Sequence, residues 1–424
     1  MREKSSLIPM LIIGVLFFIF GFVTWLNGSL IPFLKVICDL NEFEALFVTF
    51  AFYIAYTVMA YPMAIVLEKT GYKVGMQLGL LVMAVGSLLF IPAALSAEFL
   101  LFLVALFTLG TGLTILQTAS NPYIVLVGPL ESAAMRISIM GLINKSAGVL
   151  APLAFTAYIL SGIGPVENIA SDQLELVAIK LVEPYILMAG ILSSLYLLVK
   201  YSSLQELEFT SDPYDNNSIF TFPKVVLGAV ALFFYVGIEV IAGDTIGLYA
   251  QSLGVQNATA LTSYTMAFMV IGYIVGVVFI PKYLSQENAL IGSSLLGIAL
   301  LAGVTFSSTS SSGISEVLWG WSGIGTIPDS ITFVALLGLS NALVWPSIWP
   351  LVLEDLGKHT AKASALLIMA IAGGAILPLL FGKISELSGN MQSTYAYATV
   401  CYLFILMYAV KWHKMISWNG DERE

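Results

Sequence analysis

Residues 16–22 read LFFIFGF and residues 232–238 read LFFYVGI, so the chain of 424 residues contains one apolar pattern twice. A second pair of similar words follows in the same order, AGVLAPL at residues 147–153 and GGAILPL at residues 373–379. Matches that recur in order at a long spacing predict an internal structural repeat. The chain is therefore expected to fold as two similar halves.

The composition excludes a soluble globular protein. Apolar residues make up 58% of the chain and charged residues 10%, and the mean hydropathy is strongly positive. A helix needs about 20 mostly apolar residues to cross a bilayer, and the chain offers about a dozen such runs. The sequence thus predicts an all-α membrane protein with 12 transmembrane helices. The expected spans are residues 8–34, 44–67, 75–95, 99–127, 134–161, 184–200, 223–252, 259–281, 288–306, 331–353, 364–387 and 393–412.

Basic residues set the expected orientation. Most Lys and Arg residues fall in the loops on one side of the predicted spans, whereas Lys35 and Lys180 fall on the other. Because loops rich in Lys and Arg stay in the cytoplasm, both termini are expected there, with the chain in a plasma membrane. A polar stretch at residues 202–222 predicts a cytoplasmic linker. Residues 1–201 then form the first six-helix half, and residues 223–424 form the second.

Polar and charged residues interrupt the apolar runs at the depth of the bilayer. Such side chains are costly there if unpaired, so their presence indicates a function inside the membrane. A polar site between two repeated halves is typical of secondary transporters. These residues are Asn27, Gln117, Asn144, Lys145, Glu239 and Asp244.

Several words carry a family resemblance. Residues 117–123 read QTASNPY, and FGF at residues 20–22 is followed by Leu26-Asn27. These words resemble the fourth and first helices of the fucose:proton symporter family, which is part of the major facilitator superfamily. GLSN at residues 338–341 and AGGAILP at residues 372–378 resemble the branch that contains glucose/galactose and N-acetylglucosamine porters.

The resemblance implies the major facilitator fold of two six-helix halves with the substrate between them. It also implies import of a hexose, glucose-like or galactose-like, by symport with a cation and alternating access. N-Acetylglucosamine, mannose and fucose remain alternative sugars, and an uncoupled uniporter remains the alternative mechanism. The family expectation is a monomer in the lipid bilayer.

The chain departs from the resembling family at two acidic positions. The fucose carriers place an aspartate in the first helix and a glutamate in the fourth, and the matching residues here are Gly28 and Gln117. Neither residue can titrate. Under the repeat, Asp244 corresponds to Gly28 in the other half, so Asp244 is expected to take part in cation coupling with Glu239 and Lys145. A sodium ion near Asp244 is favoured over a proton, since hard cations prefer oxygen ligands; proton coupling stays open.

Glu239 and Asp244 lie about 140° apart on an ideal helix and do not share a face. Gly237, Gly243 and Gly247 would allow a break that brings the two carboxylates together. Lys145 lies too deep for its ammonium to reach the membrane surface easily. It is interpreted either as a partner of one acid with a role in coupling, or as half of a structural ion pair.

Sugar recognition needs amides, carboxylates and flat aromatic side chains, because a hydroxyl both donates and accepts hydrogen bonds. The alternative for each amide is a hydrogen bond between helices. The fucose carriers have a bulkier amide where this chain has Gly141, so the resemblance implies room there for a larger substituent such as an N-acetyl group. The candidate substrate-binding residues are Asn27, Gln117, Asn121, Asn144, Glu239, Asn341, Trp345 and Tyr53.

Glu68, Lys69 and Lys73 are expected to close the cytoplasmic side, although plain positive-inside topology explains the two lysines equally well. Motifs of other functional classes are missing from the sequence. It contains no GxSxG or HExxH word and no nucleotide-binding P-loop, so neither an enzyme nor an ATP-driven pump is expected. No cofactor, apart from sodium as a co-substrate, and no nucleic-acid partner is expected.

Overall fold

The computed structural model describes residues 7–126, 133–159, 161, 174–204, 219–280, 283–354, 356 and 359–419. Twelve helices in these ranges are long and apolar enough to cross a membrane, which confirms the predicted number of spans. The α-helices are α1 (Leu7–Trp25), α2 (Asn27–Ile37), α3 (Glu42–Ala45), α4 (Phe47–Ser96), α5 (Phe99–Leu126), α6 (Ala133–Ile159), α7 (Leu174–Ile179), α8 (Val182–Tyr201), α9 (Pro223–Ser252), α10 (Thr262–Phe279), α11 (Gln286–Phe306), α12 (Gly313–Trp319), α13 (Asp329–Ala342), α14 (Val344–Leu353), α15 (Thr360–Met369), α16 (Gly373–Ser388), α17 (Met391–Thr394) and α18 (Thr399–Val410).

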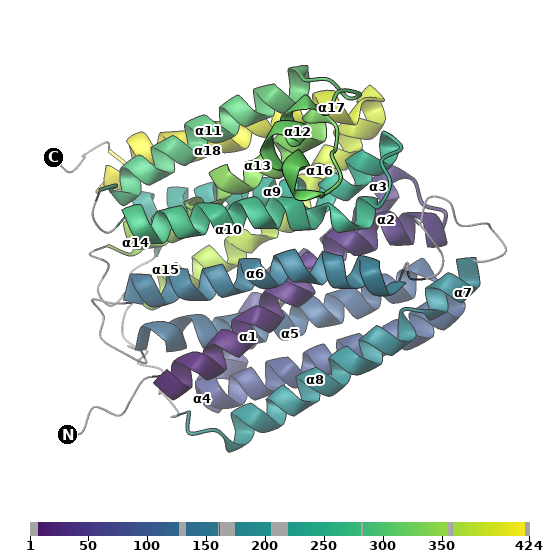
Figure 1. Cartoon of the computed structure of the whole chain (residues 1–424). Coiled ribbons are helices and arrows are strands. Elements are labelled where there is room, and N and C mark those ends of the chain that lie inside the picture. Colours follow the sequence, from purple (N-terminus) through teal and green to yellow (C-terminus); the bar gives the residue numbers. More distant parts are fainter. Residues whose placement is uncertain are drawn as a thin grey trace.

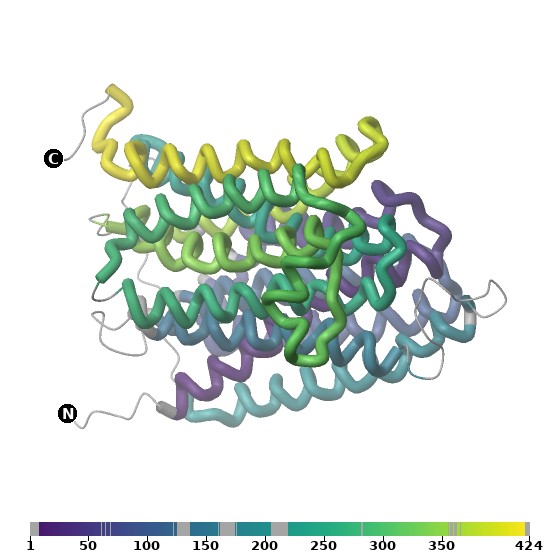
Figure 2. The backbone as a smooth tube through the Cα atoms, turned by 45° about the horizontal axis from the view of Figure 1, so that its top comes forward, coloured from purple at the N-terminus to yellow at the C-terminus, as the bar shows by residue number. Residues whose placement is uncertain are grey.

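The long helices run side by side in one bundle (Figure 1). The start of α1 and the end of α18 lie at the same end of this bundle, and the turned view agrees (Figure 2). We call this end the terminal side and the opposite end, near α3, α7 and α17, the far side. Following the predicted division, we refer to helices α1 to α8 as the N-terminal half and to α9 to α18 as the C-terminal half.

The helices of the first three predicted spans depart from one helix per span. The first span consists of α1 and α2, which are separated at Leu26. Helix α4 contains the second and third spans, and its backbone leaves the helical region at Gly71, with φ 78° and ψ 175°. Only glycine adopts this conformation without a steric penalty, which is why the chain can turn here, between the predicted spans at residues 44–67 and 75–95.

The break that the glycines would allow in the seventh span does not occur. Helix α9 runs without interruption from Pro223 to Ser252. Its glycines provide room for neighbouring helices instead. A β-carbon at Gly237 would lie 2.2 Å from Leu377, and one at Gly243 would lie 2.6 Å from Trp25. The glycines are therefore packing positions of a straight central helix.

Between α11 and α13 the chain forms the short helix α12, whose first turn is tied to Asp329 by a hydrogen bond from the Ile314 amide, 2.8 Å. Residues 205–218 of the expected linker lie outside the described residues. The division at residues 202–222 therefore stays a prediction.

Candidate functional site: a buried polar seam between the halves

A buried ion pair joins the two halves. The Lys145 ammonium in α6 lies 2.6 Å from Glu239 Oε1 in α9, and the two side chains are 10% and 8% exposed. The same ammonium lies 4.3 Å from the centre of the Trp25 ring, at the end of α1. Removing one partner of such a pair leaves an uncompensated buried charge, which typically costs about 3–5 kcal/mol. The pair therefore fixes α6, α9 and α1 relative to one another.

Trp25 itself is clamped between the halves. A β-carbon at Gly148 in α6 or at Gly243 in α9 would lie 2.6 Å from the indole, so glycine on both sides makes room for the ring. The indole is 2% exposed. The two glycines therefore leave the room that the Trp25 ring fills, and Lys145 is its cationic neighbour.

Asp244 lies one and a half turns further along α9 and faces a different helix. Its side chain is fully buried, and Oδ2 accepts a hydrogen bond from Thr49 Oγ1 of α4, 3.0 Å. Within the part of the chain that the structure describes, Oδ1 has no hydrogen-bond partner. Since Glu239 pairs with α6 and Asp244 with α4, the two carboxylates keep the separate faces expected of an unbroken helix.

The first group of predicted sugar-binding residues is contiguous with these acids. Gln117 Nε2 in α5 donates to the Tyr56 hydroxyl in α4, 2.9 Å. Tyr56 stacks on Tyr53, with ring centres 6.2 Å apart. Tyr53 in turn lies within electrostatic reach of both Asp244 and Glu239. Gln117 and Tyr53 are therefore brought together with the charged residues.

Two more amides border this group. Asn144 is half-buried beside Lys145, and its Nδ2 donates to the Phe17 carbonyl of α1, 3.3 Å. Asn121 is half-buried about one turn beyond Gln117, toward the terminal side. These positions retain partial access and free hydrogen-bonding capacity.

In the C-terminal half, Trp345 is next to Tyr235, which lies between it and Glu239. The Trp345 ring centre lies 6.3 Å from that of Tyr235, and Tyr235 lies close enough to Glu239 to interact with its carboxylate. Asn341, in contrast, is fully buried between α13 and α18. Its Oδ1 accepts a hydrogen bond from Tyr402, 2.7 Å, which is the helix-to-helix bond weighed as its alternative.

Asn27 is buried at the start of α2, and its Nδ2 has no hydrogen-bond partner among the described residues. The expected space at Gly141 is not empty. A β-carbon there would lie 2.9 Å from the Tyr273 ring of α10, so an aromatic side chain already fills the room that the sequence left for an N-acetyl group.

The predicted gating residues lie on the terminal side, away from this seam. Lys69 is exposed. Lys73 Nζ donates to the Ser202 carbonyl just after α8, 2.9 Å, a contact within the N-terminal half. The side chain of Glu68 lies outside the described residues. The gating role of this group stays a prediction.

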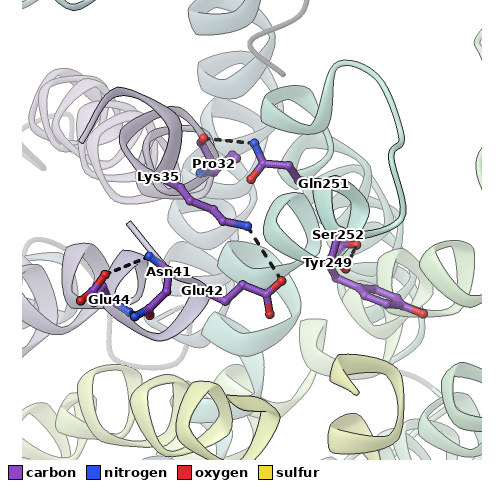
Figure 3. A network of polar contacts seen from close by, with 8 residues as sticks. All are labelled: Pro32, Lys35, Asn41, Glu42, Glu44, Tyr249, Gln251 and Ser252. Atoms are coloured by element: carbon purple, nitrogen blue, oxygen red, sulfur yellow. Dashed lines mark hydrogen bonds and ion pairs between the residues drawn. The ribbon is translucent and has the colours of Figure 1, made fainter. Parts of the chain in front are cut away.

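The sequence analysis missed a set of polar contacts that join the halves on the far side. The hydroxyls of Thr156 in α6 and Thr259, just before α10, are 2.8 Å apart. Gln251 Nε2 of α9 donates to the Pro32 carbonyl of α2, 3.4 Å, beside the Lys35–Glu42 ion pair (Figure 3). These polar side chains are distributed over several helices and form no sequence motif, so the sequence alone could not identify them.

Twelve spans in two halves, with charged residues buried where the halves meet, define a secondary transporter. The chain belongs to the Major Facilitator Superfamily, whose sequence profile matches residues 13–379. This membership confirms the expected fold and a transporter rather than an enzyme. The far-side contacts and the central ion pair are thus contacts between the two halves of a major facilitator bundle.

Similar proteins also support the resemblance to the fucose:proton symporter family. A glucose/galactose transporter of Brucella abortus (strain 9-941) is 32% identical over 404 residues, which are 93% of this chain and 92% of the relative. The L-fucose-proton symporter of Escherichia coli (strain K12) is 26% identical over 430 residues, 96% and 94% of the two chains. The crystal structure of FucP, a major facilitator transporter, in the outward conformation matches with a TM-score of 0.71 and 25% identity, and covers 96% of this chain and 99% of FucP. The resemblance drawn from residues 20–27 and 117–123 is confirmed.

Proposed function

We propose that this protein imports a hexose by symport with a cation across a bacterial inner membrane, with the terminal side in the cytoplasm. Lys69, Lys73 and the other basic loops support that orientation. The relatives named as glucose/galactose transporters support a hexose. The far side, where the halves touch, is then extracytoplasmic, and the described conformation is closed to the outside.

The surroundings of Asp244 carry the proposal of coupling. Glu239 is already compensated by Lys145, so it has no need to gain or lose a cation in this conformation. Among the residues that the structure describes, Asp244 has no such partner: it is fully buried and receives one hydrogen bond. A carboxylate in that setting is strongly disfavoured unless it binds a proton or another cation. Asp244 is therefore the coupling residue, and Glu239 is a permanent acceptor for sugar hydroxyls.

The same surroundings favour a proton over the sodium ion that the sequence favoured. Sodium prefers several oxygen ligands, as other hard cations do. Because α9 is unbroken, its carbonyls near Asp244 remain in the helix. Those of Ala242 and Gly243 also accept the hydroxyls of Thr265 and Thr262, at 3.1 and 2.7 Å. A proton needs no ligand beyond the carboxylate itself, and sodium remains the alternative that the experiment below tests.

The sugar is proposed to bind beside the ion pair. Gln117, Asn121 and Asn144 offer amides with partial access, and Tyr53 and Trp345 offer rings. Asn27 and Asn341 are fully buried, so we assign them to helix packing in this conformation. Closure of the cytoplasmic side by Glu68, Lys69 and Lys73 and a monomeric state remain part of the proposal.

Uptake of labelled glucose and galactose into proteoliposomes tests the proposal, with an inward proton gradient or an inward sodium gradient imposed separately. We expect accumulation with the proton gradient, loss of accumulation in Asp244→Asn, and retained sugar exchange in that variant. Glu316→Gln, in the far-side helix α12, is the matched control. Accumulation driven by sodium alone would show that the coupled cation is sodium and not a proton. Accumulation that persists in Asp244→Asn would overturn the assignment of Asp244 as the coupling residue.

A further inference from the structure

The hydrogen bond between Thr49 and Asp244 connects the two halves. Thr49 lies in the first turn of α4, in the N-terminal half, and Asp244 lies in α9, in the C-terminal half. Both side chains are fully buried, and the two oxygens are 3.0 Å apart. The hydrogen bond that Asp244 accepts therefore comes from the opposite half of the molecule.

Thr49 uses its hydroxyl differently from many other helical threonines of this chain. Those hydroxyls donate to the carbonyl four residues earlier in the same helix, at 2.7–2.9 Å, which is the usual local bond of a helical threonine. A hydroxyl can rotate between such a local acceptor and another partner at low cost. The locally bonded residues are Thr70, Thr108, Thr111, Thr114, Thr118 and Thr305.

The contact lies next to the seam that closes the far side. The Gly243 carbonyl, one residue before Asp244, accepts a hydrogen bond from Thr262 Oγ1 of α10, 2.7 Å. Thr262 is packed directly against Gly28 of α2. If the two halves part on this side, α4 moves away from α9 and the Thr49–Asp244 bond is lost with the seam.

We propose that Thr49 is a positioning residue that binds Asp244 only while the far side is closed, and thereby ties the state of the coupling carboxyl to the conformation of the transporter. This rests on the proposed role of Asp244. The other charged or titratable groups around Asp244 are Tyr53 of α4 and Glu239 of α9, and Glu239 carries Lys145 of α6. Neither Tyr53 nor the ion pair is altered by changing Thr49.

The experiment separates sugar exchange from gradient-driven accumulation in proteoliposomes. Thr49→Val removes the hydroxyl at nearly constant shape. We expect its exchange rate to stay within about twofold of the parent and its accumulation ratio to fall about tenfold, the scale of one lost hydrogen bond. Thr49→Ser restores the hydroxyl and should restore accumulation. Thr114→Val, which removes a buried hydroxyl with a local partner, should change neither.

Equal losses of exchange and accumulation in Thr49→Val would indicate a merely structural role and overturn the inference, as would full accumulation. Thr49→Ala makes the same comparison if the valine variant does not fold. Failure of the wider proposal is distinguishable, because Asp244→Asn would then keep its accumulation. Loss in Asp244→Asn with none in Thr49→Val rejects only the role of Thr49.

Discussion

Gly28 of α2 and Thr262 of α10 approach so closely that a β-carbon at position 28 would lie 2.0 Å from the Thr262 hydroxyl. That hydroxyl cannot simply turn away, since Thr262 Cβ and Cγ2 would both lie 2.9 Å from the same β-carbon. The two residues belong to different halves and meet on the far side. Glycine at position 28 therefore permits the closed outer seam, and any side chain there would hold the halves apart.

Gly28→Ala should consequently trap the transporter open to the far side. We expect uptake to fall by at least about tenfold, because a clash of this size destabilises the closed state by more than the 1.4 kcal/mol that corresponds to tenfold. Sugar binding from the far side should persist. Uptake and sugar binding in the same preparation measure both effects.

Gly190→Ala is the control for this substitution, since a β-carbon at Gly190 in α8 meets no atom within 4 Å. It should transport normally. Normal uptake by Gly28→Ala would show that the seam opens and closes without a close approach at this position.

The elements that the sequence predicted well are those with a strong periodic or compositional signal. The spans follow from long apolar runs, and the turn at Gly71 follows from a polar word between two such runs. The sequence left open whether α9 breaks, because glycine has two uses, flexibility and close packing. Only the neighbours Leu377 and Trp25, which are distant in sequence, decide between them.

The Lys145–Glu239 pair makes a prediction about stability. Lys145→Met leaves a buried carboxylate without its countercharge, and we expect it to lower the free energy of unfolding by about 3–5 kcal/mol. Lys145→Met combined with Glu239→Gln removes both charges and should recover most of that loss. Thermal unfolding of the detergent-solubilised protein tests the comparison. A double variant as unstable as the single one would mean that Lys145 acts through Trp25 packing instead.

Sequence reasoning named both acids and Lys145 but could not pair them. The position of each residue within an apolar run shows that burying its charge is costly. Which residues pair depends on how helices α6 and α9 cross, and the sequence does not show this. Thr49 was missed altogether. A threonine in an apolar run has no distinguishing signal until the structure shows that its hydroxyl points to the opposite half.

Cys38, between α2 and α3, makes a prediction about pH dependence. Burial, together with the nearby Glu98 carboxylate, raises the pKa of this thiol to about 11. The reactive species is the thiolate, whose fraction rises about tenfold per pH unit as long as the pH is below the pKa. Alkylation of Cys38 by iodoacetamide in a Cys401→Ser background should therefore keep accelerating from about pH 8 to pH 10, beyond the pKa of about 8.5 of an ordinary cysteine.

Mass spectrometry of the labelled peptide gives the alkylation rate. Glu98→Gln removes the smaller of the two causes and should lower the pKa, so that labelling at a fixed pH becomes faster. A rate that reaches its plateau near pH 9 would contradict the raised pKa.

The hydroxyls of Thr156 and Thr259, 2.8 Å apart on opposite halves, allow the outer seam to be locked covalently. Atoms this close on two side chains are compatible with the β-carbon separation of about 3.5–4.5 Å that a disulfide requires. Thr156→Cys and Thr259→Cys, in a background with Cys38→Ser and Cys401→Ser, should form a disulfide on oxidation and stop uptake, and a reductant should restore uptake.

Ser388→Cys with Thr394→Cys is the matched control, because these hydroxyls are 3.3 Å apart within the C-terminal half. Its disulfide constrains no motion between the halves and should leave uptake intact. If the cross-linked Thr156–Thr259 variant still transports, the far-side seam does not have to open during the cycle, and alternating access at this seam is refuted.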